Sequence, residues 1–176
     1  MNATQRPPLP HVSRLAGALS LAIPALTLAA VPPLGTADLS IHVNGSTVKV
    51  ELSAAAQTLV GFSGAPTDAA SREVLKVAEE NLKHGEALVR FNPLASCILD
   101  DAKVDADPRE QKGEAGMGAS YRFTCQFPQS FSSAALGIFT GFTALQRVHV
   151  RYTTANGQGA AILTRENPVV NFVPLK

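Results

Sequence analysis

The sequence lacks tryptophan, has only 2 cysteines and carries little charge, with 16% Asp, Glu, Lys and Arg among its 176 residues. It has no uninterrupted apolar run of about 18 residues, which excludes a multi-span membrane protein. The 15 basic residues against 14 acidic ones leave no positive excess that would attract nucleic acid. The apolar share of 45% is too high for a mostly disordered chain. Together with the length, these features predict a single globular domain.

The first thirty residues have the composition of an export signal. Arg6 and Arg14 precede a small-and-apolar run over residues 15–30, and no acidic residue occurs before Asp38. This order predicts a signal peptide over residues 1–29, with cleavage near Ala29, followed by a flexible leader over residues 30–37. A retained N-terminal anchor is the alternative, which the short run and Pro24 disfavour. We therefore expect a periplasmic or otherwise exported protein with no membrane contact beyond the signal peptide.

Export gives the two cysteines a function. An oxidising compartment would join Cys97 and Cys125, the only pair in the chain, in a disulfide bond. Two buried free thiols in a cytosolic protein are the alternative. A metal site that uses both thiols is disfavoured, because neither has a second Cys or a His within four residues.

Two β-hairpins are predicted by alternating apolar residues on either side of an Asn-Gly pair. The first surrounds Asn44-Gly45 and the second surrounds Asn156-Gly157. Asn-Gly is typical of a two-residue turn in which both central residues have positive φ. Further strands are predicted over residues 97–104 and 121–127, on either side of a flexible loop over residues 106–120.

One amphipathic helix of about sixteen residues is predicted between Thr67, as its N-cap, and Gly85, as its C-cap. Its apolar positions recur at helical spacing: Val74, Leu75, Ala78 and Leu82. Strand patterns outnumber helical ones, and no β-α-β alternation occurs. The predicted class is α+β, a mainly antiparallel sheet with hairpins and one amphipathic helix packed on it, in a single domain over residues 38–172.

No catalytic or cofactor-binding residue is predicted, and we expect the protein not to be an enzyme. The segment from Gly61 to Ala65 superficially resembles the nucleophile elbow G-x-S-x-G around Ser63, but Ala65 replaces the final glycine. A glycine-containing turn before the helix explains the same residues. Nothing else in the chain indicates a catalytic triad.

Metal binding has two candidate residues, Glu80 and His84, which are spaced to share one face of the helix. The alternative is a solvated helix end, where the helix dipole favours a histidine. His149 is a poorer ligand because Arg147 and Arg151 flank it on the same face of a strand. A solvated loop is also favoured over a calcium site for six acidic residues, Asp100, Asp101, Asp105, Asp107, Glu110 and Glu114.

The order of short motifs resembles the ZrgA-like family of periplasmic proteins linked to zinc homeostasis. The motifs that carry the resemblance are Asn44-Gly45, Leu59-Val60-Gly61-Phe62, Ala65-Pro66-Thr67-Asp68, Cys97, Tyr121-Arg122-Phe123-Thr124-Cys125, Phe142-Thr143-Ala144-Leu145-Gln146-Arg147-Val148 and Leu163-Thr164-Arg165-Glu166-Asn167-Pro168. The resemblance implies the fold, the compartment and a zinc-related role. It also implies a His-x-His-Gly segment before the first strand and a zinc-binding His/Asp tract between the cysteine strands.

This chain departs from the family at those zinc-holding positions. Residues 31–35 keep only the glycine of the His-x-His-Gly segment, and residues 103–120 contain no histidine. We therefore expect a non-enzymatic accessory protein with lost or weak zinc binding, no cofactor and a periplasmic protein partner. Two alternatives remain: a low-affinity divalent-metal buffer that uses Glu80, His84 and the acidic loop, and a generic secreted protein-interaction domain. The oligomeric state is left open.

Overall fold

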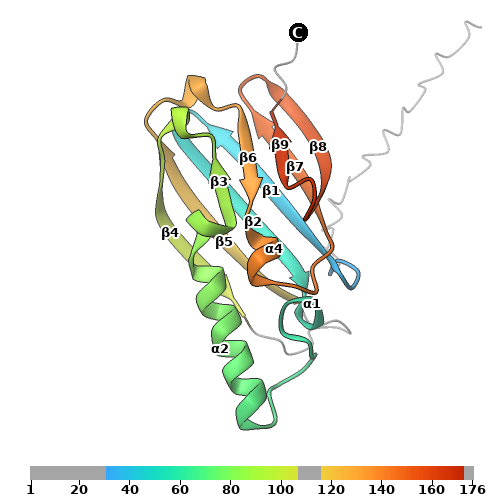
Figure 1. Cartoon of the computed structure of the whole chain (residues 1–176). Helices are drawn as coiled ribbons and strands as arrows, with labels where there is room; N and C mark the ends of the chain where they lie inside the picture. Colours follow the sequence, from blue (N-terminus) through green and yellow to red (C-terminus); the bar gives the residue numbers. More distant parts are fainter. Residues whose placement is uncertain (1–30, 107–115, 173–176) are drawn as a thin grey trace, which may run out of the picture.

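The computed structural model describes residues 31–106 and 116–172, and its two sheets lie face to face (Figure 1). The predicted signal peptide lies outside the described residues. A six-stranded sheet has the order β4-β5-β2-β1-β7-β8, and a three-stranded sheet has the order β3-β6-β9. Among the described helices, none combines the length and hydropathy needed to cross a membrane.

The large sheet is antiparallel except where β1 and β7 run parallel. This parallel pair joins the two predicted hairpins into one sheet. The strands are β1 (Thr36–Asn44), β2 (Thr47–Ala55), β4 (Cys97–Asp105), β5 (Gly116–Cys125), β7 (Arg147–Thr154) and β8 (Gly157–Thr164).

Both predicted hairpins form, but neither turn is centred on its Asn-Gly pair. The first turn lies one residue later in the chain than predicted, and the second lies one residue earlier. In the first hairpin Asn44 pairs with Thr47, so the central residues are Gly45 and Ser46. Only Gly45 has a positive φ, 58°, as in a type II′ turn with glycine at its first central position. In the second hairpin Thr154 pairs with Gly157, so the Asn-Gly pair again does not occupy both central positions.

The small sheet consists of three short strands from distant parts of the chain, β3 (Val89–Phe91), β6 (Ser133–Leu136) and β9 (Val169–Asn171). Aromatic side chains link it to the large sheet. The Phe91 and Phe123 rings lie edge to face with their centroids 5.1 Å apart. The centroids of the Phe172 and Tyr152 rings are 5.0 Å apart. The hydrophobic core lies between the two sheets.

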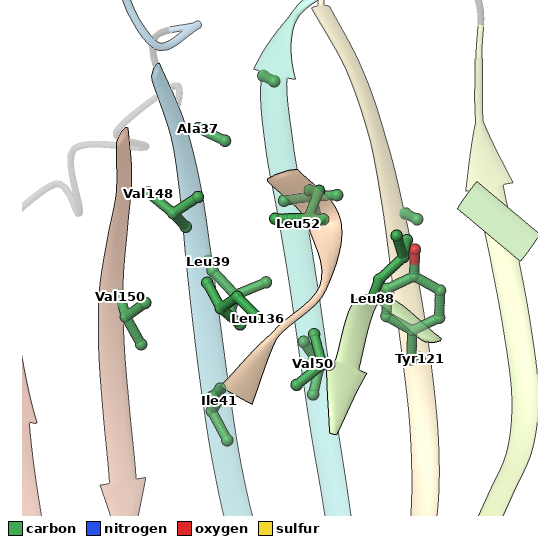
Figure 2. Close-up of a cluster of buried hydrophobic side chains, with 14 of the residues drawn as sticks. Ala37, Leu39, Ile41, Val50, Leu52, Leu88, Tyr121, Leu136, Val148 and Val150 are labelled. Carbon is green, nitrogen blue, oxygen red and sulfur yellow. The ribbon is translucent and has the colours of Figure 1, made fainter. Parts of the chain in front are cut away.

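Alternate residues of the central strands build this core, as their period-2 pattern predicted. Figure 2 shows side chains of β1, β2 and β7 directed into one cluster together with Leu88 and Leu136. The largest fully buried side chains are Phe123, Leu39, Ile41, Leu82, Leu145, Val48, Val50, Val148, Val150 and Cys125.

The predicted amphipathic helix is confirmed as α2 (Ala69–Lys83). Its N-cap is Asp68, whose carboxylate accepts the Ser71 backbone N–H at 2.7 Å, and its C-cap is His84. Three shorter α-helices and two 3₁₀ turns accompany it in the described chain: α1 (Ala56–Val60), α3 (Gly85–Leu88), α4 (Ile138–Gly141), η1 (Pro93–Ala95) and η2 (Pro128–Ser130).

The predicted apolar face of α2 packs only in part, because Leu75, Ala78 and Leu82 contact the core whereas Val74 does not. Ala78 and Leu82 are buried, whereas Val74 and Val77 are 45% and 51% exposed. Figure 1 shows the first turns of the helix extending past the end of the sheet. The fold is therefore dominated by its sheets, with antiparallel pairing as predicted and a smaller helical share than the α+β label implies.

Two segments predicted to be irregular contribute to the sheet. Strand β1 begins at Thr36, inside the predicted leader, and β5 begins at Gly116, inside the predicted loop 106–120. The glycines of residues 116–120 favoured a loop in the sequence pattern. In the structure Gly118 lies against the Leu52 carbonyl, where a Cβ atom would clash, so glycine here permits close approach of two strands.

Candidate functional site

The two predicted metal-binding residues lie at the corner where α2 ends and α3 begins. Glu80 Oε1 accepts a hydrogen bond from Lys83 Nζ at 2.8 Å. His84 Nδ1 lies 3.6 Å from Glu86 Oε1, beyond ordinary hydrogen-bonding distance. The structure thus pairs each predicted ligand with a different neighbour. A cation bound between Glu80 and His84 would compete with the Lys83 ammonium group for the Glu80 carboxylate.

The contact between Glu80 and Lys83 also shifts the pKa values of both side chains. The hydrogen bond and the positive charge of Lys83 lower the pKa of Glu80, and Glu80 in turn raises the pKa of Lys83. Both side chains are more than half exposed, so water screens the pair and it adds little stability. The corner consequently presents a mixed group of charges, which is typical of a solvated helix end.

A buried contact fixes the position of this corner on the sheet. The Tyr121 hydroxyl of β5 donates a hydrogen bond of 2.7 Å to the Leu82 carbonyl oxygen. Burial raises the pKa of Tyr121. The Tyr121 ring also packs against Gly85, where a Cβ atom would lie only 2.5 Å from the ring. A side chain at this position would therefore overpack the Tyr121 ring, which favours glycine where the chain turns from α2 into α3.

Of the six acidic residues assigned to a solvated loop, Asp100, Asp101 and Asp105 instead lie on strand β4. Asp100 Oδ2 accepts the Thr124 hydroxyl at 2.7 Å, and Asp101 Oδ2 lies 3.3 Å from an Arg122 guanidinium nitrogen. Asp107, Glu110 and Glu114 lie outside the described residues. Both described pairs cross from β4 to β5, so they support the strand pairing.

The histidines of the described chain lie on three separate elements, His42 on β1, His84 after α2 and His149 on β7. His149 Nδ1 is 3.4 Å from Asp38 Oδ1, across the parallel β1–β7 pair. This partner could not be predicted from the sequence, because no local pattern shows that β1 and β7 are neighbours. Within residues 31–106 and 116–172, no group of three or more His, Cys, Asp or Glu side chains is placed to hold a metal ion.

The predicted disulfide is present between Cys97 and Cys125, with an S–S distance of 1.99 Å. The two residues face each other at the ends of β4 and β5. Cys125 is buried in the core and Cys97 packs against it from the edge. The bond joins the bases of the two strands on either side of residues 106–115.

A cleft of about 620 Å³ opens beside this disulfide. Its lining includes Arg90 and Phe91 of β3, Cys97 of β4 and Phe123 of β5. Its described lining contains no histidine and no serine–histidine pair. Ser63, the residue of the elbow-like segment, lies in the exposed connection between α1 and α2 and does not line the cleft.

Comparison with known protein families shows which family has this fold and sequence pattern. The model of the ZrgA family zinc uptake protein matches residues 33–172, nearly the whole described chain. The chain belongs to the ZrgA family. Membership confirms the resemblance and connects the protein with zinc uptake. No curated protein matches the chain.

The ZrgA scaffold here does not offer zinc a fitting set of ligands among the described residues. Zinc sites in proteins use about three or four imidazole, thiolate or carboxylate ligands at short spacing. Both cysteines are held in the disulfide, and the largest donor combination around a histidine is a pair, such as His149 with Asp38. These donors do not fit a resident zinc ion.

Proposed function

We propose that this member of the ZrgA family is a non-enzymatic, exported accessory protein of zinc uptake that acts through protein contact and has little or no zinc affinity of its own. The family match over residues 33–172 supports the zinc-related role. The disulfide is consistent with an oxidising compartment. The absence of histidine from residues 103–120 is the sequence feature that supports weak or lost zinc binding.

In this proposal the chain keeps the fold of its family and has lost the side chains that would coordinate zinc. The family match covers residues 33–172, while the histidines implied for zinc binding are missing from the sequence. A metal buffer at Glu80 and His84 is less well supported, because the Lys83 ammonium group already neutralises the Glu80 carboxylate. The remaining route to a zinc-related role is contact with another periplasmic protein that carries the ion.

Deletion and complementation in the host bacterium test this proposal. Cells that lack the protein should contain less zinc in zinc-limited medium, and added zinc should relieve the defect. A triple variant, His42→Ala, His84→Ala and His149→Ala, should restore zinc content as well as the wild type does. These three side chains are exposed or half-buried, so their removal should change stability by only about 0.5 kcal/mol each.

Two results would contradict the proposal. An unchanged zinc content in the deletion strain would remove the role in zinc uptake. Failure of the folded triple variant, with export and circular dichroism like the wild type, would show that the histidines of this chain act directly on the ion.

A further inference from the structure

Strand β8 forms one border of the six-stranded sheet and pairs only with β7 among the described residues (Figure 1). A border strand exposes main-chain N–H and C=O groups that can pair with another chain, and proteins usually protect such a strand. The opposite border, β4, has two such protections. Its register shifts between Leu99 and Asp101, and it contains four charged residues, Asp100, Asp101, Lys103 and Asp105.

Strand β8 has neither protection. Residues 155–164 contain no charged side chain and no proline, and β8 pairs with β7 in continuous register from Gly157 to Thr164. Its exposed residues are Gln158, Ala160 and Ile162, and the apolar side chain of Ile162 is 65% exposed. An approaching strand would therefore meet neither a bulge nor a charge.

The main-chain hydrogen bonds of β8 show which of its N–H and C=O groups point away from β7. In an antiparallel pair, alternate residues direct both main-chain groups toward the partner strand, and those between direct them away. The Thr164 N–H donates to the Asn167 carbonyl at 3.3 Å, so it points away from β7. By alternation, Gln158, Ala160 and Ile162 also direct their N–H and C=O groups to the open border.

We propose that two copies of this chain associate through β8, antiparallel and about a two-fold axis at Ala160, to form one continuous twelve-stranded sheet. This register places Ala160 opposite Ala160 of the second copy and Gln158 opposite Ile162. All three pairs are of the hydrogen-bonded type, so the free groups of both strands are satisfied together. The three free residues thus match their own antiparallel copy.

A second copy fits this border because no like charges would meet across it. The uncharged β8 would lie against an uncharged strand, whereas two β4 strands paired about their centre would bring aspartates together. Arg151, opposite Ala160 on β7, is the nearest cation in the register. Its copy would lie three strand spacings away, about 14 Å, which exceeds the Debye length of about 8 Å in physiological salt.

Sedimentation of the full exported protein over a concentration series tests the proposal. The wild type should sediment as a reversible dimer. Ile162→Lys should weaken the dimer about tenfold or more, because it places a charge on each border strand. Ile98→Lys is the matched control, because Ile98 is a similarly exposed isoleucine, 72%, on the opposite border strand β4, and it should leave the dimer unchanged.

Cysteine cross-linking gives an independent measurement of the register. Ala160→Cys should form an intermolecular disulfide under mild oxidation, since hydrogen-bonded pairs in antiparallel strands have Cα atoms about 5.5 Å apart. Thr153→Cys, on β7, should not cross-link. A wild type that remains monomeric to about 1 mM (roughly 4 kcal/mol), or equal weakening by the two lysine variants, would overturn the proposal. Absence of the Ala160→Cys cross-link in a dimeric sample would also overturn it.

Discussion

At the scale of single residues, Gly85 and Tyr121 determine how the main helix joins the sheet. The Tyr121 ring occupies the space where a side chain at residue 85 would lie, and its hydroxyl bonds the Leu82 carbonyl of the last helical turn. The late carbonyls of a helix lack partners within the helix. Tyr121 supplies one from β5, so a single aromatic residue both packs against the corner and completes its hydrogen bonding.

Replacing Gly85 with alanine should lower the free energy of unfolding by about 2 kcal/mol, since the added methyl group overpacks the Tyr121 ring. Urea denaturation followed by circular dichroism measures this. Gly141→Ala is the control, because its Cβ atom would meet Asn81 at 3.7 Å, an ordinary contact. The control should change stability by less than about 0.5 kcal/mol. Equal effects of the two substitutions would contradict the packing described for Gly85.

Tyr121→Phe should lower the free energy of unfolding by about 1–2 kcal/mol at neutral pH, because the buried Leu82 carbonyl loses its donor. The pH dependence should also change. Burial raises the pKa of Tyr121 above its ordinary value of 10.0, so the folded state resists ionisation of the phenol. Stability is therefore retained below about pH 10 and is lost as the pH rises above it, where the unfolded chain releases its proton.

Denaturation at several alkaline pH values should show the wild type losing stability faster than Tyr121→Phe above about pH 10. The difference between the two proteins isolates Tyr121 from the other titrating groups. Parallel curves for both proteins would contradict the burial of this hydroxyl.

Predictions for single residues were confirmed where the residue type allows only one pairing in this chain. The disulfide between Cys97 and Cys125 is such a case, because the chain has no other cysteine. Turn residues were harder to place. An Asn-Gly pair locates a hairpin, but the register of the strands decides which two residues are central, and Gly45 with Ser46 proved to be the pair. Nothing in the sequence indicated that Gly85 faces an aromatic ring.

At the scale of elements, the disulfide stabilises the β4–β5 pair across a separation of 28 residues. Reduction of the wild type should lower the free energy of unfolding by roughly 3.5 kcal/mol in the chain-entropy model. Urea midpoints with and without a reducing agent measure the difference. The double variant Cys97→Ala and Cys125→Ala is the control, and the reducing agent should not change its midpoint. Identical midpoints for oxidised and reduced wild type would contradict this role.

Elements with a long repeating pattern were predictable, and short ones were not. The α2 helix and the four hairpin strands extend over enough residues to show their periods. Strands β3 and β9 have 3 residues each, which is too short for a period-2 pattern. Strand β5 was predicted five residues short at its start, because its glycines indicate a loop unless the approach of Gly118 to Leu52 is known.

At the scale of the whole molecule, the parallel pairing of β1 with β7 could not be predicted. It joins segments more than one hundred residues apart, and it brings His149 beside Asp38. The candidate site was consequently predicted only in part. Glu80 and His84 do share the end of one helix, but their actual partners, Lys83 and Glu86, follow from side-chain geometry.

The central claim is that a zinc-uptake scaffold persists in this chain without a zinc site of its own. Calorimetric titration of zinc into the protein, purified in its oxidised form, tests it most directly. His84→Ala in parallel reports on the corner of α2, and its titration should match that of the wild type. The account predicts no stoichiometric binding tighter than about 1 μM, which corresponds to roughly 8 kcal/mol. Saturable binding of one zinc ion per chain below that concentration would contradict it.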